Sequence, residues 1–86
     1  MQSKNKKAPT AAERAHIARV ASLSCVVCGA APVEVHEPEQ GMWMIAIPLC
    51  WGCHRGPHGW HGDRLHWKLQ KMTELKAINE TWKRLA

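Results

Sequence analysis

Cysteine and histidine, which supply sulfur and nitrogen ligands to zinc, are concentrated in the segment CWGCHRGPHGWHG at residues 50–62. Cys50 and Cys53 repeat the C-x-x-C spacing of Cys25 and Cys28, and 21 residues separate the two pairs. Two such pairs at this separation are typical of a zinc site, because zinc prefers four ligands in a tetrahedron. We therefore predict one structural Zn²⁺ on these cysteines, with a rubredoxin-type iron site as the rarer alternative.

The histidines need a separate explanation, because a zinc ion held by four cysteines keeps no open coordination position. His54 and His58 are four residues apart, which places two imidazoles on the same side of a helical turn. With His36, at the end of an expected strand, they can form an open three-nitrogen site that binds water and substrate. His61 is a further candidate ligand. Polar surface or helix-capping histidines are the alternative.

Local patterns predict the elements that position these residues. The motif TAAE, from Thr10 to Glu13, is a capping box that starts a helix ending near Leu23, with His16 on its solvent side. VEVH alternates as a strand, and MWMIAI at residues 42–47 predicts a second strand. The resulting hairpin carries Cys50 at its far end, and Pro48 is expected to end the strand ladder.

The second half of the chain predicts helices. Residues 51–55 can form one short turn, because Gly and Pro follow it. Asp63 is expected to cap a helix with apolar Leu65, Leu69 and Met72 at helical spacing. Thr73 can cap another, with an apolar face that comprises Leu75, Ile78, Trp82 and Leu85. The pattern leaves open whether these are two helices or one bent helix.

Length and charge restrict the class of protein. The chain has 86 residues, enough for a single domain over residues 10–86, and a core this small benefits from a structural metal. The formal net charge is +5, which favours a polyanionic partner, nucleic acid first. Residues 1–9 are expected to form a disordered basic arm. We see neither a secretory signal nor a membrane span, so we expect a cytoplasmic protein with reduced thiols.

Residues 22–86 resemble a known family through VEVHE and IPLCWGCHRGPHGWHGDRLHW. These segments look like an HNH nuclease of the ββα-metal type, similar to the phage family of recombination-enhancing, RecA-dependent nucleases. The resemblance implies an α+β fold, a small zinc-stabilised ββα-metal domain with an N-terminal helix and C-terminal helices. It also implies that His36, His54 and His58 bind a second, catalytic divalent ion, for which Mg²⁺, Mn²⁺, Ni²⁺ and Zn²⁺ are the candidates.

The chain departs from this family at two points. Glu37 follows His36 where many relatives have a histidine that activates water, and MWMIAI contains no asparagine. Two alignments therefore stay open. In the first, His36 is a ligand and Glu37 is the base or a further ligand. In the second, His36 is the base and the metal rests on His54, His58 and Glu37. The predicted catalytic residues are thus His36 and Glu37.

The resemblance implies a metal-dependent DNA endonuclease with little sequence specificity, of phage or prophage origin. It would act in recombination in the bacterial host cytoplasm, with a RecA-type recombinase filament as a further partner. Arg55, Arg64, Lys68 and Lys71 are candidate DNA contacts, the last three forming one stripe on a helix. Trp60 is a candidate exposed stacking residue. The alternative is a non-catalytic, zinc-finger-like DNA- or protein-binding module.

Overall fold

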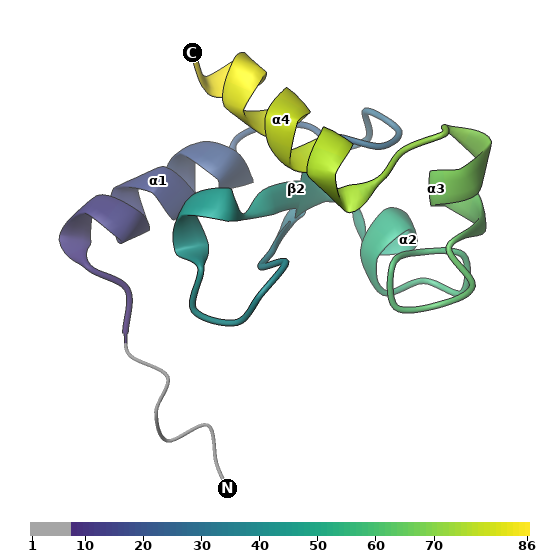
Figure 1. Cartoon of the computed structure of the whole chain (residues 1–86), viewed down its shortest axis with the longest axis horizontal. Helices are drawn as coiled ribbons and strands as arrows, with labels where there is room; N and C mark the ends of the chain where they lie inside the picture. Colours follow the sequence, from purple (N-terminus) through teal and green to yellow (C-terminus); the bar gives the residue numbers. More distant parts are fainter. Residues whose placement is uncertain (1–7) are drawn as a thin grey trace, which may run out of the picture.

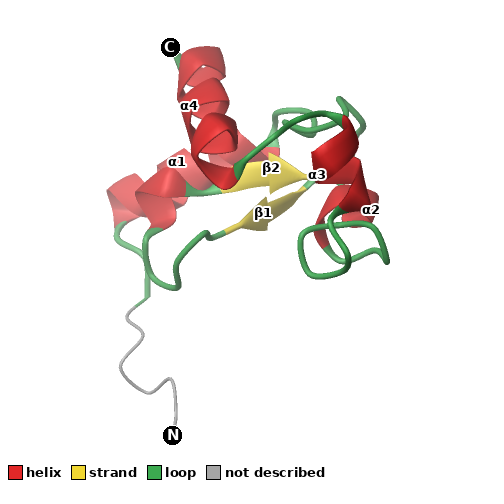
Figure 2. Ribbon diagram, turned by 45° about the vertical axis from the view of Figure 1, so that its right-hand side comes forward, coloured by secondary structure: helices red, strands yellow, loops and turns green. Residues whose placement is uncertain are grey.

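Two short antiparallel strands form the centre of the structure. β1 spans Glu34–His36 and β2 spans Ile47–Leu49, and the register pairs His36 with Ile47. In the computed structural model, which describes residues 8–86, helices surround this ribbon (Figure 1; Figure 2). The expected basic arm over residues 1–9 lies outside the described residues except at its last two positions.

The first helix begins as its capping box predicts. α1 spans Ala11–Ala21, the Thr10 hydroxyl accepts from the Glu13 amide at 3.1 Å, and the Glu13 carboxylate accepts from the Thr10 amide at 2.8 Å. The prediction of a surface position for His16 is wrong, because its side chain is 5% exposed. Its ring stacks on Trp82 of the C-terminal helix with centroids 4.9 Å apart, so a helix remote in sequence covers it.

The second strand is shorter and later than predicted. Trp43–Ile45 forms a 3-10 helix, η2, and β2 includes Pro48 instead of ending before it. Proline is tolerated because each strand of a two-stranded ribbon is an edge strand. The carbonyl of Pro48 accepts from the Val26 amide at 3.0 Å, so β2 also anchors the segment that carries the first cysteine pair.

Three helices follow β2. The expected short turn is present as α2, Trp51–His54, and the C-terminal region forms two helices, α3 at Leu65–Leu69 and α4 at Glu74–Leu85. Lys71 between them has a left-handed φ of 53°, which ends the first helix and decides against one bent helix. Thr73 caps α4 as predicted, its hydroxyl accepting from the Lys76 amide at 3.1 Å.

The core lies where the cysteine segments, β2, α3 and α4 meet. Its buried residues include Cys25, Cys53, Ile47, Leu49, Trp67 and Ala77. The apolar face expected on α4 is correct only in part. Ile78 packs against the core and Leu85 is half-buried, but Leu75 and Trp82 are exposed, and the fully buried positions are Ala77 and Thr81. Among residues 8–86, no helix combines the length and the apolar character that a membrane span requires.

Candidate functional site

The four cysteines come together as their spacing predicts. The Sγ atoms of Cys25, Cys28, Cys50 and Cys53 all lie within 4.8 Å of one another. The sulfurs of Cys28 and Cys50 are 3.6 Å apart. Zinc–sulfur bonds of about 2.3 Å in a tetrahedron place neighbouring sulfurs about 3.8 Å apart. The cluster is therefore close enough to coordinate a structural metal such as zinc.

The surroundings of the sulfurs also fit a cation. Burial opposes ionisation of Cys25, but backbone hydrogen bonds from Cys50, Cys28 and Val27 outweigh it and lower the pKa of this thiol. Burial raises the pKa of the Cys28 and Cys53 thiols, and in Cys53 the nearby Cys25 sulfur adds to the effect. Several thiolates this close repel one another, and a divalent cation offsets both the repulsion and the desolvation.

One short helix serves both candidate sites. Cys50 is the N-cap of α2, and its carbonyl accepts from the His54 amide at 3.0 Å. Cys53 is buried in the core, and the next residue, His54, is only partly buried and faces a pocket on another side. α2 thereby connects the cysteine cluster to the group of histidines described next.

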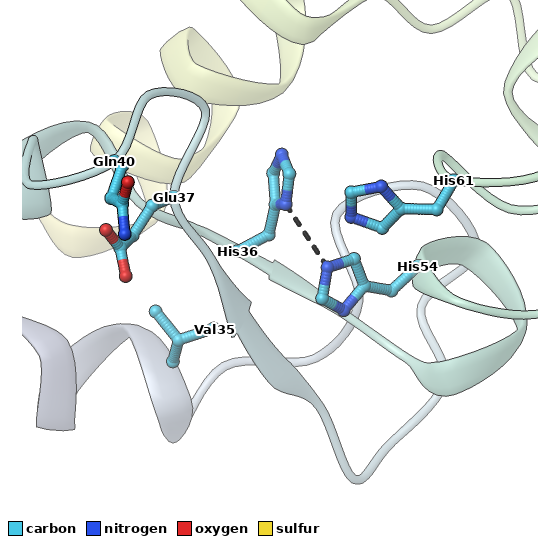
Figure 3. A pocket seen from close by; sticks show the side chains of 6 residues that line it. All are labelled: Val35, His36, Glu37, Gln40, His54 and His61. Atoms are coloured by element: carbon cyan, nitrogen blue, oxygen red, sulfur yellow. Dashed lines mark hydrogen bonds between the residues drawn. The ribbon is translucent and has the colours of Figure 1, made fainter. Parts of the chain in front are cut away.

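Three histidines form the second group. The ring nitrogens of His36, His54 and His61 lie within 4.8 Å of one another, and His36 Nδ1 is 3.2 Å from His54 Nε2. The first comes from the end of β1, the second from the end of α2 and the third from the loop that follows. Figure 3 shows the three rings pointing toward one another. They line a pocket of about 260 Å³, together with Val35, Glu37 and Gln40.

A carboxylate fixes the proton of His54. Glu34 Oε1 is 2.7 Å from His54 Nδ1, and Arg55 binds Glu34 through Nε at 3.0 Å and through a second guanidinium nitrogen. Hydrogen bonds from Arg55 and His54 hold the pKa of Glu34 below its ordinary value, so the group is ionised. A carboxylate only accepts, so the proton resides on Nδ1. In the neutral ring, which is the form that binds a metal, His54 Nε2 then presents a lone pair to His36.

The second imidazole is held in the same way. His36 Nε2 lies 3.2 Å from Glu74 Oε2, which places the ring proton on Nε2 and the lone pair on Nδ1. Burial lowers the pKa of His36 and the charge on His54 adds to this, which together outweigh the hydrogen bond to Glu74 that raises it. With both rings neutral, two lone pairs face each other at 3.2 Å. Two nitrogens on one tetrahedral zinc lie about 3.3 Å apart, so the pair is suited to sharing a cation.

His58 lies outside this group. Its Nδ1 is 3.1 Å from both carboxylate oxygens of Asp63. The expected set of His36, His54 and His58 is thus not the set that the structure gathers, because α2 ends at His54 and helical spacing no longer applies. The loop folds back instead, and the His61 amide donates to the His54 carbonyl at 3.0 Å, which brings His61 to the site.

Glu37 lines the pocket from a different side. Its Oε1 accepts from the Gly41 amide at 2.8 Å, and Gly41 has a left-handed φ of 88° that favours glycine in this turn. In Figure 3 its carboxylate lies beside Gln40, across His36 from the other two imidazoles. Glu37 does not belong to the group formed by His36, His54 and His61. Its role as base or ligand stays a prediction.

Two of the candidate DNA contacts are engaged within the chain. Arg55 binds Glu34 as described, although 61% of its side chain is exposed. The guanidinium of Arg64 lies 3.6 Å from the centre of the Trp60 ring, and its Nε donates to the Trp60 carbonyl at 2.8 Å. Both arginines therefore have structural partners near the histidine site.

The predicted basic stripe is wrong as a helical feature. Arg64 and Lys71 have left-handed φ values of 64° and 53° and flank α3, so only Lys68 of the three lies within the helix. Lys68 and Lys71 are exposed. Trp60 is half-buried against Trp67, with centroids 4.8 Å apart, and does not project as a free stacking residue.

Sequence reasoning missed both carboxylates that hold the histidines. Glu34 could have been found, because period-two alternation in VEVH places Glu34 and His36 on the same face of the strand. Glu74 has no comparable local signal, because 38 residues separate it from His36. His66 was also missed as a neighbour of the cysteine cluster. Its Nδ1 is 3.8 Å from Cys53 Sγ.

Comparison with known proteins identifies no relative, since no family model, curated protein or solved structure matches this chain.

Proposed function

We propose that this protein is a metal-dependent endonuclease that hydrolyses phosphodiester bonds in DNA with little sequence specificity. The observation that carries the proposal is the group formed by His36, His54 and His61, whose ring nitrogens lie within 4.8 Å of one another beside an open pocket. Three protein ligands around one divalent ion leave positions for water and for a phosphate oxygen, which a closed structural site lacks.

The three imidazoles would hold the ion, and imidazole nitrogen suits zinc or nickel better than magnesium. Bound there, such an ion supplies Lewis-acid stabilisation of the charge that develops on the scissile phosphate. Glu34 and Arg55 orient His54 so that its Nε2 lone pair points to the site. His61 is exposed, so the site is accessible to a polymer.

The chain order of the elements agrees with the family that the sequence resembles. β1, β2 and α2 occur in this order, with only η2 between the strands, and His36 lies at the end of the first strand and His54 at the end of the helix. This order supports a ββα-metal reading of the site. The net charge of +5 supports a polyanionic substrate, because Lys and Arg side chains bind phosphates without reading base sequence.

The experiment is plasmid nicking by the purified full chain, loaded with zinc at the cysteine cluster and supplied with each divalent ion in turn. His54→Ala and His61→Ala should abolish ion-dependent nicking while the circular dichroism spectrum stays unchanged. His58→Ala is the matched control, because His58 contacts Asp63 and not the histidine group. It should nick at nearly the wild-type rate.

Two outcomes would contradict the proposal. Loss of nicking in His58→Ala with retention in His61→Ala would show that the active site uses a different set of histidines. The proposed nuclease function is also ruled out if the wild-type protein nicks no plasmid with magnesium, manganese, cobalt, nickel or zinc, alone or with a RecA-type filament. A non-catalytic zinc-binding module would then take its place.

A further inference from the structure

The C-terminal helix begins beside the histidine group. Glu74 is the first residue of α4, and its Oε2 lies 3.2 Å from His36 Nε2. His36 is 7% exposed and Glu74 is 28% exposed, so the contact is largely shielded from water. The contact thus joins α4 to β1, and its two residues are 38 positions apart in the sequence.

The carboxylate decides which nitrogen of His36 can bind an ion. With Glu74 accepting the Nε2 proton, Nδ1 keeps its lone pair and faces His54 Nε2 at 3.2 Å. Without this acceptor the ring can carry its proton on Nδ1 instead. That proton would donate to His54 Nε2, and the hydrogen bond would occupy both ligand atoms at once.

The position of Glu74 is set by the packing of its helix. The Thr73 hydroxyl caps the first turn through the Lys76 amide at 3.1 Å. Ala77 and Thr81 are buried on the inner face, where the Thr81 hydroxyl donates to the Ala77 carbonyl at 2.8 Å. Figure 1 shows α4 crossing the ribbon next to β2. A side chain on a packed helix is positioned more accurately than one on a loop.

We propose that Glu74 is a positioning residue for the histidine metal site, and that docking of α4 against the ribbon completes this site. The proposal rests on the proposed function for the presence of a divalent ion at the histidines. It extends the site from the ββα elements to the C-terminal helix, and it assigns the helix the task of fixing the tautomer of a ligand.

The test measures ion binding and tautomer state in the full chain with zinc already bound at the cysteines. Nickel binding is followed by calorimetry in wild type, Glu74→Ala, Glu74→Gln and Glu80→Ala. Loss of an outer carboxylate typically weakens metal binding by about 10–100-fold, and Glu74→Ala should fall in this range. Glu80→Ala is the control, because Glu80 lies on the same helix and pairs with Lys83 and Arg84.

The glutamine variant separates positioning from helix stability. A negative charge in the first turn stabilises a helix, and both Glu74 variants lose that charge. Glutamine still offers an amide oxygen that can accept the His36 Nε2 proton, so Glu74→Gln should bind nickel better than Glu74→Ala. Nitrogen-15 NMR of the zinc-loaded protein before nickel is added should show the His36 proton on Nε2 in wild type. In Glu74→Ala it should move to Nδ1.

The outcomes distinguish this proposal from the nuclease. Equal nickel affinity in Glu74→Ala and wild type, or an unchanged His36 tautomer, would overturn the role of Glu74 and leave the nuclease standing. Nickel binding by wild type without any nicking would overturn the nuclease and leave the role of Glu74 standing. A wild-type protein that binds no ion at the histidines would overturn both.

Discussion

Replacement of Gly62 by alanine tests whether the loop that carries His61 is closed as the structure shows. A Cβ at Gly62 would lie 2.2 Å from the carbonyl oxygen of Pro57 and 2.8 Å from that of Gly56. Both contacts are to backbone atoms, so a side-chain rotation cannot relieve them. The Pro57 carbonyl also accepts from the Asp63 amide at 3.0 Å, and opening the loop breaks this hydrogen bond.

The cost follows from these two effects. Overpacking a closed site destabilises a protein by about 1–3 kcal/mol, and losing the hydrogen bond adds about 1 kcal/mol. The sum of about 2–4 kcal/mol corresponds to a melting temperature at least about 8 °C lower in a chain of this size. The displacement of His61 should also weaken nickel binding at the histidine site by about tenfold or more.

The assay is thermal unfolding by circular dichroism at a fixed zinc concentration, followed by nickel calorimetry on the folded variant. Gly52→Ala is the matched control. Its Cβ would meet only His66 Cε1 at 3.8 Å and Cys50 Sγ at 4.0 Å, which is ordinary contact. Alanine is favoured over glycine within a helix by about 0.5–1 kcal/mol, so Gly52→Ala should melt at or above the wild-type temperature. A Gly62→Ala protein that melts within about 2 °C of wild type and binds nickel equally would refute the closed loop.

Three further predictions concern the metal, the DNA contacts and the acidic neighbour of His36. Elemental analysis should find one tightly bound zinc per chain. A strong chelator should unfold the domain, because metal binding supplies much of the folding free energy of a small chain. Purified protein that contains neither zinc nor iron would contradict this prediction. Arg55→Ala should change the slope of log affinity against log salt by much less than the 0.9 or so that one phosphate contact contributes, because Arg55 already binds Glu34. Lys68→Ala should reduce the magnitude of that slope by about 0.9. A large change in Arg55→Ala with little change in Lys68→Ala would refute Lys68 as the phosphate contact. Glu37→Gln should leave nickel affinity within about twofold of wild type, since its carboxylate caps the turn at Gly41, away from the histidine nitrogens. At saturating nickel, a base role for Glu37 requires the nicking rate of this variant to fall by about a hundredfold or more, and a smaller loss would eliminate that role.

Features that depend on neighbours a few residues apart could be predicted from the sequence. The capping box at Thr10, the cap at Thr73 and the short turn after Cys50 are present, because each is decided by hydrogen bonds within one helical turn. The cysteine cluster also followed from spacing. Each C-x-x-C turn brings two sulfurs together by itself, and a short hairpin is sufficient to join the two turns.

The composition of the histidine group depended on the tertiary structure. Helical spacing favoured His58 over His61, but Gly56 and Pro57 end the periodicity, and the path of the loop is then decided by backbone hydrogen bonds to α2. The burial of His16 likewise depends on Trp82, which belongs to a helix that packs across α1. No local pattern encodes these contacts, since they join segments that are remote in sequence.

Glu74 shows the limit of sequence reasoning most clearly. As an acidic residue one position after a threonine cap, it has a sufficient local explanation in the helix dipole. Its contact with His36 exists only because Ala77 and Thr81 bury one face of α4 and thereby direct its first turn to the end of β1. The sequence determined which side chains can bind a metal, and the packing of α4 and the 56–62 loop decided which of them meet, because only packing brings distant segments to within the reach of one ion.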